Sequence, residues 1–261
     1  MANKKAKSMV DKTEYCPKDL NDHIFYGLEL DEEQKVFRDA IWSDDIDIVF
    51  CDARAGTGKT LVSIATALLL YEHKNYNGIV YVTSPTQEEK LGYLPGNKDD
   101  KISPYTNPIK KALIKLNYVP DTMIANENIQ NVKEGACIEC VSHNYLRGDN
   151  FDDKIIIIDE AQNMYLDELK KTLTRVNSTC KTIVIGHSGQ CDLFKNKIRS
   201  GFSFYREWFK DKPRAAVCEL NTNHRGWVAN HADDLDTVAL TEYLNRMTDD
   251  SVIDLRQFMI K

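Results

Sequence analysis

The sequence contains no long hydrophobic run and no recognisable secretory leader. Its longest apolar stretches, residues 68–71 and 155–158, are much shorter than the roughly 20 residues that cross a bilayer. The basic residues at the start are followed by polar ones, whereas a signal peptide needs an apolar segment there. We therefore expect no membrane partner. Residues 1–23 are predicted to form a polar N-terminal tail, of which residues 1–8 are expected to be solvated and frayed.

A disulfide framework is absent as well. The seven cysteines are odd in number and irregularly spaced, so the chain is expected to be cytoplasmic rather than secreted. Cys137 and Cys140 form a single C-x-x-C pair inside a strand-like stretch, without a second pair or a histidine at zinc-finger spacing. Two small strand residues are a better interpretation of this pair than a zinc site or a redox site.

Positive charge does not dominate the composition. The formal net charge is −6 and the pI is about 5.6, which excludes a protein coated in positive charge. A local basic groove can nevertheless coexist with an acidic total, so nucleic acid is not excluded as a partner. The 261 residues, 42% of them hydrophobic and 28% charged, have the composition of a globular protein.

Strand-like and helix-like stretches alternate from about residue 30 onward, which predicts a layered α/β fold with a mainly parallel sheet. Strands are predicted at short runs, several of them β-branched: residues 46–51, 79–83, 155–158, 182–185 and 215–220. Helices are predicted over residues 30–42, 59–71, 109–116, 166–176 and 202–209, and from residue 227 on. We assign residues 24–240 to one core domain and residues 241–261 to a C-terminal extension.

A phosphate loop follows the first predicted strand. Residues 53–60 read A-R-A-G-T-G-K-T and fit the pattern G-x-x-x-x-G-K-[ST], except that Ala53 replaces the first glycine. Gly56 and Gly58 allow the backbone N–H groups to point at phosphate oxygens. Lys59 is expected to reach the β- and γ-phosphates, and the Thr60 hydroxyl to bind Mg²⁺. The predicted nucleotide-binding residues are Gln34, Ala53, Arg54, Ala55, Gly56, Thr57, Gly58, Lys59 and Thr60.

The context of this loop supports its assignment. A buried strand runs into it and an apolar helix leaves it, which is the arrangement that phosphate binding requires. A glycine-rich turn with a solvent-facing lysine is therefore the weaker interpretation. The sequence predicts a P-loop protein that binds and hydrolyses ATP.

An acidic pair ends another predicted strand, about 100 residues downstream of the phosphate loop. Asp159 is placed to hold Mg²⁺ at the carboxyl edge of the sheet. Glu160 is suited to orient and deprotonate the attacking water, which a hydrolase needs and a small-molecule kinase does not. A charged helix start would also explain two acidic residues in a row, but the matching phosphate loop favours the catalytic interpretation.

Two glutamines are candidates for further contacts with the nucleotide. Gln190 follows the next strand, where its amide could sense the γ-phosphate, although it would also suit a polar turn. Gln34 could recognise the adenine edge, because an amide both donates and accepts. It also lies three residues after Asp31, so a capping box explains it equally well.

Several segments resemble the PhoH-like family. Residues 89–96 read E-K-L-G-Y-L-P-G and are followed by Pro104, Tyr105 and Pro108; residues 145–148 read Y-L-R-G, residues 159–163 D-E-A-Q-N and residues 173–175 L-T-R. The resemblance covers about residues 30–235. It implies a phosphate-starvation-associated ATPase with a three-layer RecA-like core, similar to one domain of superfamily 1 helicases, that uses ATP and Mg²⁺ and acts on RNA.

The chain departs from the family pattern at two places. His187 stands where the family usually has aspartate, so an acidic group is missing there. Residues 221–226 read N-T-N-H-R-G and resemble a helicase segment in which Arg225 would be the transition-state arginine. No segment resembling a PIN nuclease domain precedes the core, so we do not expect the fused PhoH architecture.

The resemblance to helicases also bears on partners. A single RecA-like domain lacks the second domain that closes over the nucleotide in helicases. We therefore hypothesise a homo-oligomeric ring, such as a hexamer, in which an arginine of the neighbouring subunit completes each site. In other NTPases such an arginine raises the rate roughly 10³–10⁵-fold. Arg225, Arg147 and Arg175 are the candidates. Residues 83–86, together with Arg147, Lys90 and Lys98, are candidates for binding RNA or single-stranded DNA.

Three functions compete for this sequence. The leading one is a helicase-like ATPase coupled to the binding or remodelling of RNA or single-stranded nucleic acid. The second is a nucleotide-gated interaction module that hydrolyses ATP slowly, which His187 in place of aspartate makes plausible. The third, a small-molecule kinase, is disfavoured by Glu160 and by the absence of an arginine-rich lid.

Overall fold

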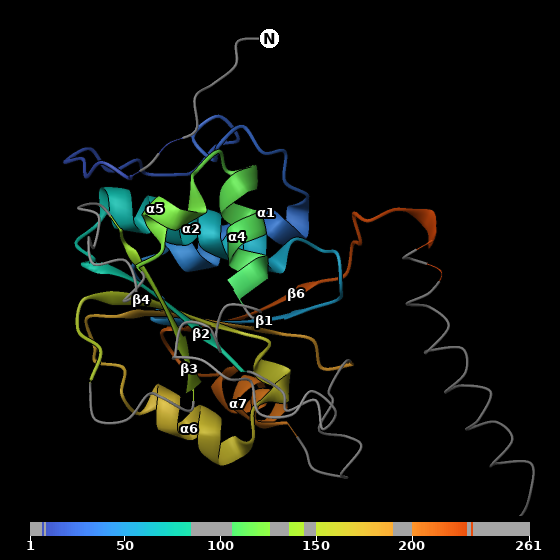
Figure 1. Cartoon of the computed structure of the whole chain (residues 1–261). Helices are drawn as coiled ribbons and strands as arrows, with labels where there is room; N and C mark the ends of the chain where they lie inside the picture. The colour runs from blue at the N-terminus through green and yellow to red at the C-terminus, as the bar shows by residue number, and fades with distance from the viewer. Residues whose placement is uncertain are drawn as a thin grey trace, which may run out of the picture.

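The structure, a computed structural model, describes residues 7, 9–84, 106–125, 136–143, 150–189, 200–228 and 231 (Figure 1). Several predicted features lie outside these residues: Gln190, Arg147, Lys90, Lys98, the segments 89–96 and 145–148, and the C-terminal extension 241–261. Within the described part of the chain, no helix combines the length and the apolar character needed to span a membrane.

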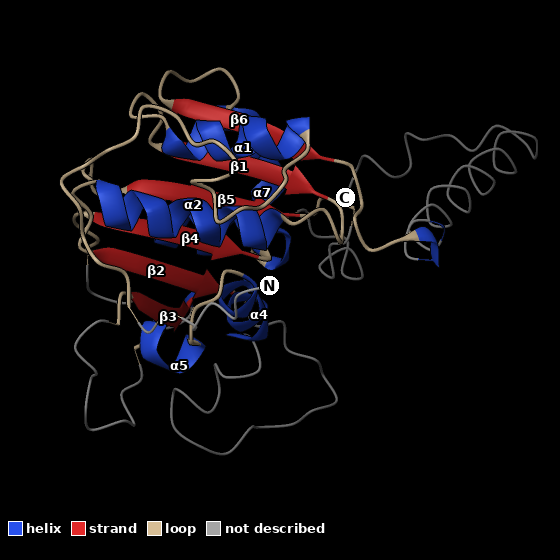
Figure 2. Ribbon diagram, turned by 90° about the horizontal axis from the view of Figure 1, so that it is seen from above, coloured by secondary structure: helices blue, strands red, loops and turns tan. Residues whose placement is uncertain are grey.

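A six-stranded sheet with the order β3-β2-β4-β5-β1-β6 forms the centre of the fold (Figure 2). Every neighbouring pair of strands is parallel. The strands are β1 Ile48–Ala53, β2 Gly78–Thr83, β3 Ile138–Ser142, β4 Lys154–Asp159, β5 Lys181–Gly186 and β6 Ala215–Leu220. The predicted α/β fold with a mainly parallel sheet is confirmed.

Helices cover both faces of this sheet, which makes three layers (Figure 1). One face carries α1 Glu32–Trp42, α2 Lys59–His73, α4 Asn107–Lys115 and α5 Pro120–Met123, and the other carries α6 Leu166–Leu173 and α7 Gly201–Phe209. A short 3₁₀ helix, η3 Ala161–Asn163, follows β4. The arrangement is that of a RecA-like P-loop domain.

The β-branched runs form strands because both faces of the sheet are covered. All residues of β2 and β5 are buried. In β4, Ile155 and Ile157 pack into the apolar cluster on the α2 side, whereas Ile156 and Ile158 pack into the cluster on the α7 side. This alternation follows from the two-residue period of a strand.

The phosphate-loop helix α2 is central to the upper layer. Nine consecutive residues from Val62 to Leu70 are buried, which is typical of a helix that is surrounded by protein on all sides. It packs against α1 and α4 and over the sheet. The position of its first turn is therefore fixed by the core of the domain.

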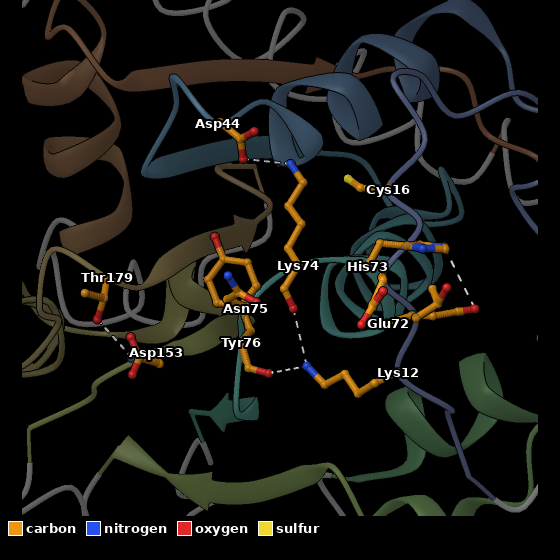
Figure 3. A pocket seen from close by; sticks show the side chains of 12 residues that line it. Lys12, Cys16, Asp44, Glu72, His73, Lys74, Asn75, Tyr76, Asp153 and Thr179 are labelled. Carbon is orange, nitrogen blue, oxygen red and sulfur yellow. Dashed lines mark hydrogen bonds and ion pairs between the residues drawn. The ribbon is translucent and has the colours of Figure 1, made fainter.

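The N-terminal segment beyond residue 8 packs partly against the domain, whereas the frayed tail expected over residues 1–8 lies outside the described residues except for residue 7. Val10 is 7% exposed and Leu20 is 2% exposed. The Lys12 ammonium donates to the carbonyls of Lys74 (3.3 Å) and Tyr76 (2.6 Å), just beyond the end of α2. The carbonyls that follow the end of a helix need donors from elsewhere in the chain, and the N-terminal segment supplies one at the edge of an open polar pocket (Figure 3).

Short elements escaped the sequence analysis. The helix α5 has four residues and η3 has three, which is too short for a hydrophobic period to be visible. The stretch with Cys137 and Cys140 does lead into a strand, β3. Among the described residues, no group of three or more histidine, cysteine or acidic side chains could hold a metal ion.

Lys181, at the start of β5, is an ionisable group inside the domain. It is 2% exposed, and its ammonium donates to the carbonyl oxygens of Ser43 (2.6 Å) and Ile46. These two carbonyls follow the end of α1, so the lysine ties this loop to the sheet. Burial lowers the pKa of Lys181 from 10.5 to about 8.

We predict that this lysine makes stability rise with pH. Between pH 8 and 10.5 the unfolded chain binds a proton that folded Lys181 has lost, so the free energy of unfolding increases with pH in this window. Across this pH window, the free energy of unfolding of the wild type should rise by up to about 3 kcal/mol more than that of Lys181→Met. Urea unfolding of both proteins at pH 7.5 and 9.5 measures the difference, and a difference independent of pH would contradict the assignment.

Candidate functional site

The phosphate loop connects β1 to α2 at the carboxyl edge of the sheet. Gly56 and Gly58 have φ angles of 82° and 84°, in the left-handed region that glycine adopts at little cost. Gly58 is also the N-cap of α2, and no side chain caps this helix start. Backbone N–H groups at an uncapped helix N-terminus form a site for anions such as phosphate.

The loop meets the acidic pair at one point. The Thr60 hydroxyl donates to the Asp159 carboxylate with an Oγ1–Oδ2 distance of 3.1 Å. The Lys59 ammonium lies 3.7 Å from the Glu160 carboxylate. Residues about a hundred positions apart in sequence are thus brought together.

Asp159 is almost completely buried at the end of β4. It is 1% exposed, and the Tyr81 hydroxyl of the neighbouring strand donates to its Oδ2 at 2.5 Å. Burial and then the nearby Glu160 charge raise the pKa of Asp159, whereas Lys59 and the Tyr81 hydrogen bond lower it. A cation beside this carboxylate would offset the cost of its burial.

Glu160 has a backbone conformation that is unusual for a residue with a side chain. Its φ and ψ are 53° and 36°, in the left-handed region, and such strain is found often at functional sites. Its N–H donates to Asp159 Oδ1 at 2.8 Å. The pair therefore precedes η3 through a tight turn and does not open an α-helix, since α6 begins only at Leu166.

Gln162 is a residue of this site that the sequence analysis did not single out. Its amide nitrogen donates to Glu160 Oε2 at 2.6 Å, and its Oε1 accepts from the His187 N–H at 3.0 Å. It thereby connects the Glu160 carboxylate to the turn after β5. Its position in the D-E-A-Q-N segment, directly after the acidic pair, is the sequence feature that could have identified it.

A second connection to the same turn comes from the residue before the phosphate loop. Asp52 Oδ1 accepts from the Ser188 N–H at 2.9 Å, and Arg206 of α7 forms an ion pair with its other oxygen. The side chain of Asp52 is 11% exposed. No spacing rule relates Asp52 to Arg206, so only the folded chain reveals this pair. In this turn the Nδ1 of His187 is buried and has no hydrogen-bond partner among the residues that the structure describes.

Gln34 lies against the phosphate loop and forms the capping box as well. Its backbone N–H donates to Asp31 Oδ1 at 2.8 Å, and its Oε1 accepts from the Asp31 N–H at 3.2 Å. Its amide nitrogen donates to the carbonyl oxygen of Thr57 at 2.8 Å. An adenine contact would rest on the remaining N–H of this amide, and it stays a prediction.

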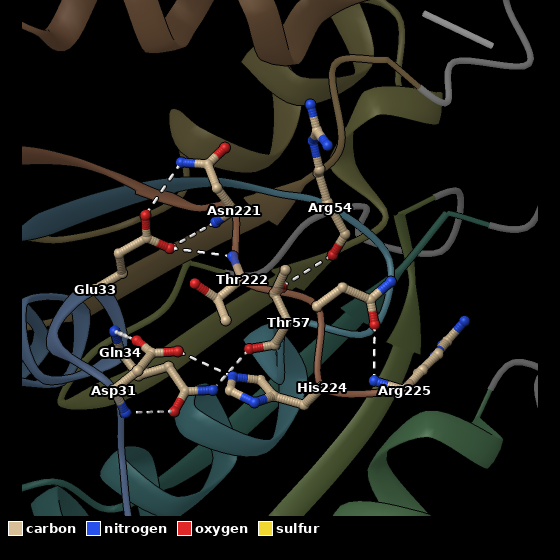
Figure 4. A network of polar contacts seen from close by, with 10 residues as sticks. Asp31, Glu33, Gln34, Arg54, Thr57, Asn221, Thr222, His224 and Arg225 are labelled. Atoms are coloured by element: carbon tan, nitrogen blue, oxygen red, sulfur yellow. Dashed lines mark hydrogen bonds and ion pairs between the residues drawn. The ribbon is translucent and has the colours of Figure 1, made fainter. Parts of the chain in front are cut away.

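Residues 221–226, which we call the strap, cross over the phosphate loop after β6 (Figure 4). The His224 N–H donates to the Gly56 carbonyl at 3.0 Å. A Cβ atom on Gly56 would lie only 2.7 Å from Arg225 Cγ and would also collide with the Asn223 side chain. The strap therefore packs against the loop at a distance that only glycine permits.

The three candidate arginines differ in position. Arg225 lies against the phosphate loop of its own chain. Arg175 follows α6, and its Nε donates to the carbonyl oxygen of Lys171 at 3.1 Å. Arg147 is outside the described residues. Whether a neighbouring subunit supplies an arginine stays a hypothesis.

The residues of the site fit a magnesium ion. Thr60 and Asp159 present a hydroxyl and a carboxylate oxygen 3.1 Å apart, and Mg²⁺ is commonly held by one or two such ligands together with water and phosphate oxygens. The buried Asp159 carboxylate has Lys59 and Glu160 beside it. This donor set is the chemistry that a nucleotide-bound magnesium ion requires.

We predict that alanine at Gly56 costs more than alanine at Gly27. Both glycines have left-handed φ angles, 82° and 67°, so each substitution should cost roughly 1–2 kcal/mol from the backbone alone. Only Gly56→Ala would also clash with the strap, which should add about 1–3 kcal/mol. Urea unfolding measures both losses, and equal losses would contradict the close approach of the strap.

Comparison with known proteins identifies the family. The sequence model described as PhoH-like protein matches residues 29–231. Protein PhoH2 of Bacillus subtilis is 30% identical over 236 residues, which cover 88% of this chain and 53% of that protein. A PhoH-like protein of Mycobacterium leprae is 38% identical over 162 residues, covering 61% of this chain and 44% of the relative. The chain spans about half the length of these relatives.

A distant structural likeness exists as well. The large terminase of a thermophilic bacteriophage, solved in complex with ADP, aligns with a TM-score of 0.46 and 12% identity over 74% of this chain and 46% of the terminase. This likeness is too low to bear on function. The match over residues 29–231, together with the identity to the Bacillus subtilis protein over most of the chain, shows that the chain belongs to the PhoH-like protein family.

Proposed function

We propose that this protein binds ATP with Mg²⁺ and hydrolyses it. The observation that carries the proposal is the meeting of the phosphate loop with the acidic pair: Thr60 lies 3.1 Å from Asp159, and Lys59 lies 3.7 Å from Glu160. A phosphate-binding lysine and hydroxyl are thus adjacent to a carboxylate suited to a metal ion and a second one suited to water. Binding alone would not require the second carboxylate.

In this proposal the loop backbone and Lys59 bind the phosphates. Glu160 orients the attacking water and accepts its proton. Its two carboxylate oxygens contact Lys59 and Gln162, and the side chain remains 46% exposed. Arriving phosphates would compete for Lys59, which would release Glu160 Oε1 towards water while Gln162 still fixes Oε2.

Thr60 and Asp159 would hold the magnesium ion, which would neutralise charge on the phosphates. Tyr81 keeps Asp159 oriented through its hydroxyl. Arg225 would stabilise charge in the transition state. Gln190, as the γ-phosphate sensor, and Gln34, as the adenine contact, complete the proposed site.

Further features of the proposal go beyond the site itself. RNA or single-stranded DNA is the proposed partner, with Thr83 and Ser84 at the end of β2 as the described part of its binding segment. Assembly into a ring, a cytoplasmic location and an association with phosphate starvation are proposed from the family resemblance. ATP hydrolysis does not depend on any of them.

We predict that Lys59→Ala and Glu160→Gln each lower the ATP turnover number. Loss of the phosphate-binding ammonium should cost about 10²–10³-fold, and loss of the base about 10²–10⁴-fold. Glu160→Gln should still bind ATP, because the glutamine keeps the shape of the side chain and leaves the phosphate loop intact. Phosphate release and nucleotide binding measure these effects, and unchanged turnover in Glu160→Gln would refute its role.

The same assay separates the two leading functions when it is repeated with single-stranded RNA. Stimulated turnover, with an RNA affinity that falls as salt increases, supports coupling to nucleic acid. Slow turnover that RNA leaves unchanged supports a nucleotide-gated interaction module. His187, which stands where the family usually has aspartate and whose backbone N–H donates to Gln162, is the feature that favours this second function.

We also predict that turnover requires Mg²⁺ through Asp159. Removal of magnesium with EDTA should abolish turnover, and Asp159→Asn should lower it at least about 100-fold, because a bound metal contributes several kcal/mol to catalysis. Tyr81→Phe should weaken the response to magnesium more mildly, since it removes one hydrogen bond to the same carboxylate. Magnesium titrations of the three proteins give the comparison. Equal magnesium dependence in wild type and Asp159→Asn would exclude Asp159 as a ligand.

A further inference from the structure

The first turn of α1 contacts both the phosphate loop and the strap (Figure 4). Glu33 accepts three hydrogen bonds from the strap: from the Asn221 N–H (2.6 Å), the Asn221 side-chain amide (3.2 Å) and the Thr222 N–H (3.3 Å). Hydrogen bonds to a charged acceptor are stronger than neutral ones. The beginning of the strap is therefore anchored to a single carboxylate.

Asp31 anchors the strap further along. Its Oδ2 lies 2.9 Å from the His224 Nε2, while its Oδ1 caps α1 through the Gln34 N–H. Gln34 in turn holds the carbonyl oxygen of Thr57 in the phosphate loop. One helical turn thus binds the strap with two carboxylates and the loop with one amide.

The strap also contacts the phosphate loop directly, so the first turn of α1, the strap and the loop each contact the other two. The His224 N–H donates to the Gly56 carbonyl, and the aliphatic part of Arg225 lies where a Cβ on Gly56 would be. Since α1 packs on α2 and on β6, the turn that holds both partners is itself fixed by the core. Arg225 is consequently positioned from a rigid helix, although its own side chain is exposed.

We propose that the first turn of α1 is the positioning element of the strap and that Glu33 is its principal positioning residue, holding Arg225 at the phosphate loop of the same chain. The effect on catalysis rests on the proposed ATP hydrolysis, whereas the anchoring does not. Glu33 touches no nucleotide in this proposal. It acts through Asn221 and Thr222 on the arginine that follows them.

A simpler explanation is that Glu33 only stabilises the N-terminus of α1, as acidic residues do in a first turn. Glu32 provides the matched control, because it lies in the same turn and carries the same charge. Its side chain is 89% exposed and pairs only with Lys35 among the contacts of the described residues. Asp31 is less suitable for a test, because its replacement would remove the helix cap together with the strap contact.

The first experiment measures ATP turnover. Glu33→Ala should lower kcat about ten-fold with a smaller change in KM, whereas Glu32→Ala should leave both within about two-fold. In an Arg225→Ala background, Glu33→Ala should have almost no further effect on kcat, because the residue that it positions is gone. Glu33→Gln, which keeps one acceptor oxygen, should recover part of the loss. Additive losses in the double variant would overturn the proposal.

The second experiment tests the anchoring without activity. Trypsin cleaves after exposed arginine, and cleavage after Arg225 requires the strap to detach locally. Glu33→Ala should be cut there at least about five-fold faster than the wild type, and Glu32→Ala at the wild-type rate. Mass spectrometry of the fragments gives the rates. Equal cleavage rates in all three proteins would overturn the anchoring proposal even if ATP is hydrolysed. If the wild type does not hydrolyse ATP but Glu33→Ala is cleaved faster, only the proposed hydrolysis is refuted.

Discussion

The organisation of the site depends on a buried carboxylate at the end of a central strand. Asp159 is 1% exposed, and a carboxylate in such surroundings is unfavourable unless charges and hydrogen bonds offset its desolvation. Thr60, Tyr81 and the Glu160 N–H all contact it. These contacts draw together the phosphate-loop helix, the neighbouring strand β2 and the turn that carries the second carboxylate. The need to satisfy Asp159 therefore sets the geometry around it.

Polar contacts extend from this carboxylate pair to the turn after β5. Gln162 connects Glu160 to the His187 backbone, and Asp52 connects the phosphate-loop strand to the Ser188 backbone. Both connections end on backbone N–H groups, so they fix the path of the chain whatever side chains the turn carries. On the other side of the loop, the strap is held by the first turn of α1. The phosphate loop thus lies between two restrained segments.

Much of the fold could be predicted from the sequence, because several core strands are β-branched runs and most residues of α2 between Val62 and Leu70 are apolar. The C-x-x-C pair leads into an ordinary strand, as its residue types suggested. The packing of Val10 and Leu20 against the domain could not be predicted from the sequence, because the few apolar residues of this segment show no period. Its hydrogen bonds to the end of α2 involve backbone carbonyls, which leave no trace in a sequence.

The sequence by itself determined the phosphate loop and the acidic pair, because glycine, lysine, threonine and carboxylates at these spacings follow from the chemistry of phosphate binding. The tertiary structure alone decided which residues support them. Gln162, Asp52 and Glu33 act through contacts between segments that lie on different strands and helices, and no local spacing relates Glu33 to Asn221. The position of Arg225 was decided in the same way, since it follows from the packing of the strap on Gly56. Such contacts depend on three-dimensional proximity, which only the folded chain provides.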